Sequence, residues 1–477
     1  MITFDQLFIG GQWRAPASSD LLEVRSPHDQ SLVGTSPAVT KADVDEAVAA
    51  ARKAFDSGPW PRMSPSERIA IIEKFNQLHA DRATQLAGLV TSENGTPLWF
   101  NTDAQPGVAA QTDAYIRAAK DFEWEQRGGE AVTTLTVREP IGVVAGIVPW
   151  NAPQYLAMAK AIPALLAGCT LVLKPSPETA LDGALFADIF TEAGLPEGVL
   201  SILPADREVS EYLVSHPDVD KISFTGSTAA GRRVASIAGS QLKRITLELG
   251  GKSAAIVLDD ADAGTVAEGI KYAALLVNGQ SCIAHTRILA PRSRHDEIVE
   301  AITAMAEGVT VGDPSAPDTF IGPLITAVQQ RKVQGYIRSG LDQGAKLATG
   351  GAEPPQGEVY RQGFYVRPTV FGQVDNSMTI AQEEIFGPVL SVIPYLDEAD
   401  AVRIANDSSF GLHGGVWSAD AEHGVEVARQ IRAGVVSVNG AFAGFDVPFG
   451  GYKCSGIGRA FGSVGLSEYL EYKAIAV

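Results

Sequence analysis

The sequence predicts an α/β fold with two lobes, each built around a parallel β-sheet. Short apolar runs rich in β-branched residues alternate with segments of helical periodicity, first from residue 141 onward and again after Cys282. Such alternation is typical of βαβ units, in which successive strands are parallel. The length of 477 residues agrees, because it corresponds to about two to four structural units.

The expected elements follow the hydrophobic pattern along the chain. Helices are expected at 40–56 and, from the cap-like Ser64, at 64–93. In the first α/β region, strands are expected at 141–148, 170–173, 199–203, 221–225 and 254–258, and helices at 180–193 and 209–215. In the second, strands are expected at 286–290, 387–394, 414–418 and 435–439, and helices at 293–307, 327–343, 398–406 and 421–431. The Gly- and Pro-containing stretch 345–372 is expected to be a surface excursion between elements.

Two segments fit neither lobe. Residues 119–139 are polar and then alternate from Val132 to Val137, and the stretch 467–477 is also strand-like. Isolated strands at such positions can pair with another subunit, since a lone hairpin is marginal in water. The alternative is that they are edge strands of this chain, and the sequence leaves both readings open.

Composition excludes several classes of protein. The net charge of −18, from 38 basic and 56 acidic residues, argues against a nucleic-acid partner or an anionic membrane surface. No apolar run reaches about 18 residues, so no transmembrane helix is expected. Residues 1–6 lack a basic segment followed by a long apolar core, so no signal peptide is evident. The three cysteines form no disulfide framework, and a reducing, cytoplasmic location is expected.

Common nucleotide and metal motifs are missing. The pair Gly456 and Gly458 has Phe461 where a dinucleotide fingerprint needs its third glycine. The sequence Gly251-Lys252-Ser253 resembles the end of a Walker A loop, but Thr246 replaces the first glycine of that motif. There is no HExxH motif and there are only seven histidines, so no catalytic metal is expected.

Two residues are candidates for covalent catalysis. Cys282 lies in a small, polar turn just before a strand, where a thiol can be exposed enough to react; a lone cysteine is, however, more often a buried small hydrophobe. Glu248 lies at a strand end before two glycines, and partial burial there would raise its pKa toward that of a useful general base. An exposed strand-end carboxylate is the simpler reading of any single glutamate.

A third motif is a possible phosphate site. Residues 224–232 read as a strand, a tight turn and the start of a helix, and helix N-termini bind phosphate through their backbone N–H groups. The Ser227 hydroxyl could add a donor. Most such Gly-Ser turns are only helix caps.

Together these segments closely resemble the NAD(P)-dependent aldehyde dehydrogenase superfamily. The resemblance spans essentially the whole chain, from residues 8–13 to 448–453. Its strongest blocks, in the order typical of that family, are Pro149-Trp150-Asn151, 224–231, 247–253, 279–282 and 383–388. Several family motifs in the order typical of the family make the resemblance specific. They favour the catalytic interpretation of Cys282 and Glu248 over the structural one.

The resemblance implies a reaction and its catalytic residues. Cys282 would attack the aldehyde carbon, giving a thiohemiacetal whose oxyanion is held by the Asn151 amide and the Cys282 N–H. Hydride transfer to the nicotinamide would leave a thioester, and Glu248 would activate the water that hydrolyses it. CoA-acylating members generally lack this glutamate, so hydrolysis is favoured over transfer to CoA.

The resemblance also implies a cofactor site for NAD, with NADP possible. Trp150 and Ser227 are expected at the pyrophosphate, Lys174 at the adenine ribose, and Glu384 and Phe386 at the nicotinamide end. The expected cofactor-binding residues are Trp150, Lys174, Arg207, Gly226, Ser227, Gly231, Leu249, Glu384 and Phe386.

One departure from the family concerns the choice of cofactor. Many NAD-preferring members carry a glutamate three residues after the lysine, but here Pro177 stands there and Glu178 follows. Arg207 falls in a segment expected near the adenine ribose, where a guanidinium favours a 2′-phosphate. We therefore expect NAD as the main cofactor with NADP usable. The alternative is that Glu178 replaces the missing carboxylate and Arg207 points to solvent.

The expected substrate is a bulky apolar aldehyde, aromatic or terpenoid-like. Family members acting on small aldehydes often place an aromatic directly after the catalytic asparagine, whereas Ala152 stands there in this chain. The expected pocket residues are Ala152, Leu156, Ala159, Ile283, Phe442 and Phe449.

By the same resemblance, the fold is two Rossmann-like parallel-sheet lobes plus a small β oligomerisation domain. The cofactor-binding domain would comprise 1–118 and 139–250, the catalytic domain 251–450, and the oligomerisation segments 119–138 and 451–477. A homodimer or homotetramer is expected. The alternatives to a hydrolytic dehydrogenase are a thiol esterase, a CoA-acylating dehydrogenase, and a binding or structural protein that keeps the fold of an enzyme without its activity.

Overall fold

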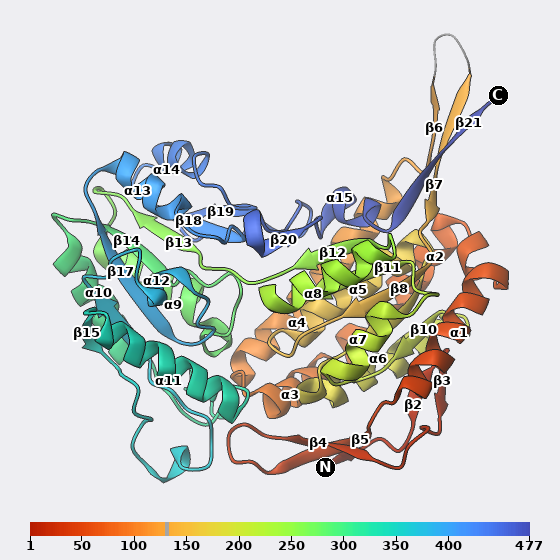
Figure 1. The fold of residues 1–477 in the computed structure, drawn as a ribbon, viewed down its shortest axis with the longest axis horizontal. Coiled ribbons are helices and arrows are strands. Elements are labelled where there is room, and N and C mark those ends of the chain that lie inside the picture. Colours follow the sequence, from red (N-terminus) through yellow and green to blue (C-terminus); the bar gives the residue numbers. More distant parts are fainter. Residues whose placement is uncertain (129–132) are drawn as a thin grey trace.

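The computed structural model describes residues 1–128 and 133–477. Figure 1 shows two large sheets lying side by side, each with helices on both faces. The first sheet has eight strands in the order β20-β12-β11-β8-β9-β10-β2-β3. Its five strands from β12 to β10 are parallel, and the pairings of β20 with β12, of β2 with β10 and of β3 with β2 are antiparallel. These strands are β2 (Leu7–Ile9), β3 (Gln12–Arg14), β8 (Val143–Ile147), β9 (Thr170–Lys174), β10 (Leu200–Ile202), β11 (Lys221–Thr225), β12 (Arg244–Glu248) and β20 (Gly456–Ile457).

The second sheet has seven strands in the order β15-β16-β17-β14-β13-β18-β19. All neighbours are parallel except the edge strand β15. The strands are β13 (Ala254–Val257), β14 (Arg287–Pro291), β15 (Lys346–Thr349), β16 (Thr369–Gly372), β17 (Val389–Tyr395), β18 (His413–Trp417) and β19 (Val435–Val438).

Helices bury both faces of each sheet. On the first sheet, one face is covered by α2 (Pro65–Asp81), α4 (Leu98–Lys120), α5 (Pro153–Ala167) and α6 (Ala180–Ala193), and the other by α1 (Lys41–Ser57), α7 (Arg207–Ser215) and α8 (Thr228–Ser240). On the second, α9 (Ala263–Leu275) and α10 (His295–Glu307) lie opposite α11 (Ala327–Asp342), α12 (Thr379–Gln382), α13 (Glu398–Asn406) and α14 (Ala421–Ala428). Strand β13 shows the pattern, since Ile256 packs into one core and Val257 into the other.

The predicted α/β class with parallel sheets is confirmed, and most expected elements are present. Three expectations need correction. The helix at 64–93 is two helices, α2 and α3 (Ala83–Asn94), interrupted at Arg82. The strand at 254–258 belongs to the second sheet. The stretch 345–372 is not only a surface excursion, because it supplies β15 and β16 to that sheet.

The two segments that fit neither lobe pair with each other. Strand β7 (Thr134–Pro140) lies between β6 (Glu125–Gly128) and β21 (Leu470–Ala476) in a separate antiparallel sheet. Figure 1 shows this sheet projecting away from the rest of the chain. Val132, where the alternating pattern was expected to begin, lies outside the described residues. The segment expected as a strand at 467–477 begins instead with the end of α15 (Gly462–Ser467).

A second small sheet at the N-terminal end has the order β1-β5-β4, formed by β1 (Ile2–Thr3), β5 (Leu32–Pro37) and β4 (Leu21–Arg25). It was not expected from the sequence. Among the described helices, none combines the length and apolarity needed to cross a bilayer.

Candidate active site

The predicted site residues gather where the parallel strands of the first sheet end. Asn151 follows β8, Lys174 ends β9, Ser227 follows β11, and Glu248 is the last residue of β12. Because carboxyl ends of parallel strands share one edge of a sheet, residues far apart in sequence meet there.

Cys282 reaches this edge from the second lobe. It follows a short 3-10 turn, Leu276–Gly279, in which Val277, Asn278 and Gly279 all have positive φ. Such angles are unfavourable for Val277 and persist only where the surroundings impose them. A Cβ on Gly279 would lie 2.5 Å from the carbonyl carbon of Gly387. The bend before the cysteine is therefore held by packing against the loop between α12 and β17.

Cys282 as a whole residue is half-buried. Burial of its sulfur, together with the carboxylates of Glu384 and Glu248, raises the pKa of Cys282 to about 12. The backbone N–H groups of Cys282 and Ile283 act in the opposite direction. In this state the thiol is protonated at neutral pH, so reaction needs a proton acceptor or an added positive charge.

Asn151 is bonded directly to the cysteine loop. Its side chain is 8% exposed, and its amide nitrogen donates to the carbonyl oxygen of Gln280 at 3.0 Å. A primary amide carries two hydrogens. One therefore fixes the side chain to the loop of Cys282, and the other remains to bind a second acceptor.

Glu248 has an environment that favours its protonated form. The residue is 8% exposed, and neither carboxylate oxygen has a hydrogen-bond partner among the described residues. Desolvation raises the pKa of Glu248 to about 8, while the positive charges of Lys160 and Arg459 lower it. A buried carboxylate with a pKa near neutrality is suited to general base catalysis.

Three of the predicted cofactor residues meet between the lobes. The ring of Trp150, after β8, meets that of Phe386 edge to face with centroids 5.5 Å apart. Phe386 has a φ of 62°, in the same turn as Glu384. The Glu384 carboxylate accepts a hydrogen bond from the N–H of Gly251 at 2.9 Å. The segment 383–388 of the second lobe is thus joined to the strand end that carries Glu248.

The start of α8 has the geometry of a helix N-terminus open to an anion. Ser227 is the N-cap, and its hydroxyl accepts from the N–H of Ala230 at 3.2 Å. The first N–H groups of a helix have no intrahelical acceptor and carry partial positive charge. Behind this turn, Leu249 packs so closely on Gly231 that a Cβ there would lie 2.4 Å from its side chain.

The predicted adenine end is split between buried and exposed residues. Lys174 is 8% exposed, and burial lowers its pKa to about 8, while the carboxylates of Glu178 and Asp206 oppose this shift. Its ammonium donates to the carbonyl of Ala205 at 3.4 Å. Glu178 is half-buried and accepts from the Ser176 hydroxyl. Arg207, the first residue of α7, is exposed.

The predicted substrate residues come from α5, from the position after Cys282 and from the loop after β19. Ala152 is the N-cap of α5, and Leu156 and Ala159 lie on that helix. Ile283 and Phe442 are exposed at 38% and 77%. Phe449 is adjacent to Gly450, where a Cβ would lie 2.8 Å from the Glu248 carboxylate.

An aromatic cluster at this end of the site was for the most part not expected from the sequence. Phe445 and Phe449 each contact Phe461, with centroids 5.3 Å and 5.6 Å apart. Phe445 also contacts Phe442 and Tyr155, and Tyr115 contacts Phe461. These residues come from α4, α5, the loop after β19 and the start of α15, so only the repeated phenylalanines of 442–461 could have indicated them.

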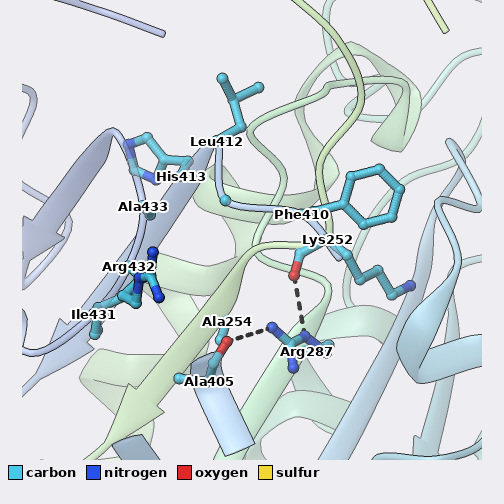
Figure 2. A pocket seen from close by; sticks show the side chains of 11 residues that line it. Lys252, Ala254, Arg287, Ala405, Phe410, Leu412, His413, Ile431, Arg432 and Ala433 are labelled. Carbon is cyan, nitrogen blue, oxygen red and sulfur yellow. Dashed lines mark hydrogen bonds between the residues drawn. The ribbon is translucent and has the colours of Figure 1, made fainter. Parts of the chain in front are cut away.

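Arg287 was also missed, although it links the two catalytic segments. This buried guanidinium, at the start of β14, donates to the carbonyls of Lys252 at 3.0 Å and Ala405 at 2.8 Å. Figure 2 shows both bonds in a pocket that none of the predicted site residues lines. Arg287 thereby fixes the chain after Glu248 to the chain after Cys282.

The fold, with Cys282, Glu248 and Asn151 meeting at the carboxyl edge of a parallel sheet, is that of an α/β enzyme. The profile of the aldehyde dehydrogenase family matches residues 13–475, and the chain belongs to that family.

Relatives and solved structures agree over almost the full length. Geranial dehydrogenase of Castellaniella defragrans is 42% identical, covering 99% of both chains. A 3-succinoylsemialdehyde-pyridine dehydrogenase of a Pseudomonas species is 43% identical, covering 100% of this chain and 99% of that one. A Mycobacterium tuberculosis aldehyde dehydrogenase complexed with NAD+ has a TM-score of 0.97 at 46% identity, covering 100% of this chain and 98% of that one. A Pseudomonas syringae aldehyde dehydrogenase mutant complexed with NAD+ and octanal has a TM-score of 0.95 at 42% identity, covering 99% and 96%.

Proposed function

We propose that this protein oxidises a bulky apolar aldehyde to the carboxylate with NAD+, using Cys282 as nucleophile and Glu248 as base. The observation that carries the proposal is the convergence of Cys282, Glu248 and Asn151 from separate segments on one strand edge. The overall reaction consumes aldehyde, NAD+ and water and releases carboxylate, NADH and two protons.

In the first step the Cys282 thiol loses its proton to water as its sulfur bonds to the aldehyde carbon, and the carbonyl π electrons move to oxygen. The second amide hydrogen of Asn151 and the backbone N–H of Cys282 stabilise that oxyanion. Losing one such donor typically costs about 10²–10³-fold in rate. Bound NAD+ supplies the acceptor for the hydride that leaves this carbon, and a thioester remains on Cys282.

In the second step Glu248 removes a proton from water as the water attacks the thioester carbon, and the Cys282–carbon bond breaks. The unpaired, desolvated carboxylate of Glu248 supports this role. It also supports hydrolysis over transfer to CoA, because water needs only an adjacent base, whereas CoA would need a binding site of its own.

The residues present fit a dinucleotide. The α8 N-terminus would hold the pyrophosphate with Gly226, Ser227 and Trp150, and Lys174 the adenine ribose. Glu384, fixed by the Gly251 N–H, would hold the nicotinamide ribose beside Phe386. NAD+ in the structures of the Mycobacterium tuberculosis and Pseudomonas syringae enzymes supports this assignment.

NAD is proposed as the main cofactor, with NADP usable. The exposed guanidinium of Arg207 supports access for a 2′-phosphate, whereas Glu178 beside Lys174 opposes it by repulsion. Steady-state kcat/KM with each cofactor tests this point, and inert NADP would exclude the NADP part of the proposal.

The substrate class rests on small side chains at Ala152 and Ala159 and on the aromatic cluster around Phe449. An apolar chain or ring would bury carbon surface there, at about 25 cal/mol per Å². The relative named geranial dehydrogenase and the octanal complex support an extended apolar aldehyde.

The test is a panel of aldehydes from acetaldehyde through octanal and benzaldehyde to citral, with NAD+ or NADP+ and with Cys282→Ala beside the natural protein. We expect turnover that needs Cys282 and favours the large aldehydes. A preference for acetaldehyde would overturn the substrate class. Ester hydrolysis without any NAD(P) binding would favour the thiol esterase, and turnover that requires CoA would favour the acylating reaction.

The sheet formed by β6, β7 and β21 is proposed as the oligomerisation element of a homodimer or homotetramer, with the domain boundaries at 118, 138, 250 and 450 given above. This sheet extends away from the two lobes (Figure 1), which supports this role. Sedimentation analysis of the whole chain, and of Tyr472→Asp on β21, would test it.

A further inference from the structure

The C-terminal end of α3 touches the loop that carries Asn151. Asn94, its last residue, is 1% exposed. Its amide nitrogen donates to the carbonyl oxygens of Trp150 at 3.2 Å and Asn151 at 3.3 Å. Its amide oxygen accepts from the N–H of Thr96 at 2.9 Å. The whole polar group of Asn94 is therefore occupied in holding two backbone segments together.

The next residue, Gly95, touches the loop that carries Cys282. Its carbonyl oxygen accepts from the side-chain amide of Asn278 at 2.9 Å. Asn278 also donates to the carbonyl of Pro323 at 2.8 Å and accepts from the N–H of Gly322 at 2.7 Å. It lies four residues before Cys282, within the bend of positive φ.

Gly95 is itself wedged in place. Its φ is 75°, and a Cβ there would lie 2.7 Å from the ring of Pro323 and 2.9 Å from that of Pro27. A Cβ on Gly322 would in turn lie 2.1 Å from the Gly95 oxygen. The turn after α3 is thus fixed against the second lobe as well as the first.

These contacts form a closed ring. Asn94 holds Asn151, Gly95 holds Asn278, and the Asn151 amide returns to Gln280 in the Cys282 loop. The two proposed oxyanion donors, the Asn151 amide and the Cys282 N–H, come from different lobes, so neither sheet alone sets their separation. The Asn94–Gly95 turn is bonded to both.

We propose that Asn94 is a positioning residue that sets the spacing of the two oxyanion donors across the lobes, acting through Asn151. This inference rests on the proposed function, in which Asn151 binds the oxyanion. A displacement of about 1 Å at reacting groups can cost about 10²-fold in rate, so the loss of two bonds to the Asn151 loop is expected to lower kcat.

The test is a double-mutant cycle on the full chain with octanal and NAD+. Asn94→Ser keeps an acceptor for Thr96 but is too short to reach the two carbonyls, and Asn94→Asp retains the shape while removing the donor. Asn101→Ser is the matched control, because Asn101 is also buried and donates to Thr91 and Thr96 beside the turn without touching the catalytic loop.

We expect Asn94→Ser to lower kcat by about 10-fold or more with the KM for NAD+ unchanged, and Asn101→Ser to leave kcat near normal at a similar melting temperature. In an Asn151→Ala background, Asn94→Ser should cause no further loss, since its effect passes through Asn151.

An equal additional loss in the Asn151→Ala background would overturn the inference, as would an equal loss of kcat in Asn101→Ser. If one Asn94 variant fails to fold, the other completes the cycle. If Asn151→Ala alone leaves kcat unchanged, the oxyanion assignment in the proposed function fails, a result separate from the behaviour of Asn94.

Discussion

Gly251 lies against the backbone of Cys282, so closely that a Cβ on it would stand 2.1 Å from the Cys282 carbonyl oxygen. The same residue donates its N–H to Glu384 and lies three positions after Glu248. Gly251 therefore adjoins the segments that carry the proposed nucleophile, base and cofactor-binding carboxylate, at a point where a side chain would force one of them to shift.

Gly251→Ala is expected to lower kcat by about 10²-fold, because the added methyl group must displace the loop that carries Cys282. Steady-state kinetics and a melting curve would be measured together. Gly239→Ala is the control, since a Cβ there meets nothing within 4 Å and alanine favours the helix. Normal activity in Gly251→Ala would show that this contact is not needed.

Activity is expected to rise with pH through about 8. Burial raises the pKa of Glu248 to about 8, and a general base must be deprotonated to act, so at pH 7 only about a tenth of the sites would be competent. The rate of thioester hydrolysis after a single turnover would be followed from pH 6 to 9. Glu248→Gln should accumulate the acyl-enzyme and lose this dependence, and a profile that stays the same in Glu248→Gln would assign the ionisation to another group.

The substitution Glu248→Gln should raise the free energy of unfolding, relative to the natural protein, by more at pH 9 than at pH 5. The folded-state pKa of about 8 lies above the usual 4.5, so between these values the folded protein binds the extra proton. The free energy of unfolding therefore falls as the pH rises through this window, and glutamine does not titrate. Melting temperatures at both pH values provide the measurement, and an equal difference at the two would contradict the explanation.

Ala152→Phe is expected to lower kcat/KM for citral and benzaldehyde at least about 10-fold while sparing acetaldehyde. Ala152 precedes α5 directly after Asn151, and an aromatic ring there would fill the space proposed for the substrate. A misfit of this kind is worth about 1–3 kcal/mol. Equal losses for all three aldehydes would point to damage of the Asn151 loop instead.

Arg207→Ala is expected to lower kcat/KM for NADP several-fold and to leave that for NAD unchanged. The guanidinium is exposed at the start of α7, where it would attract a 2′-phosphate. Arg233→Ala controls for loss of a positive charge, because Arg233 pairs with Glu211 on the same surface. Equal effects on both cofactors would place Arg207 at the pyrophosphate or outside the site.

The sequence predicted the parallel strands well because strands buried on both faces are continuous apolar runs, as in 143–147 and 170–174. The sequence did not predict β15, an edge strand of alternating exposure and mixed composition. It also did not predict β16, a short buried strand that lies within the Gly- and Pro-containing stretch 345–372. It also joined α2 and α3, whose apolar spacing continues across Arg82. In the candidate site, the predicted catalytic residues lie in short local motifs, whereas Arg287, Asn94 and Phe461 contact segments distant in the sequence, which no local pattern records.

The pairing of β12 with β20 has a consequence for how the chain is made. β12 carries Glu248, yet its outer neighbour in the first sheet is encoded after the whole second sheet. During synthesis β12 therefore emerges as an unpaired edge, and such edges are templates for pairing between chains. The nascent first lobe should depend on chaperones or on slow, cool expression until the second lobe has been translated and β20 can close the edge.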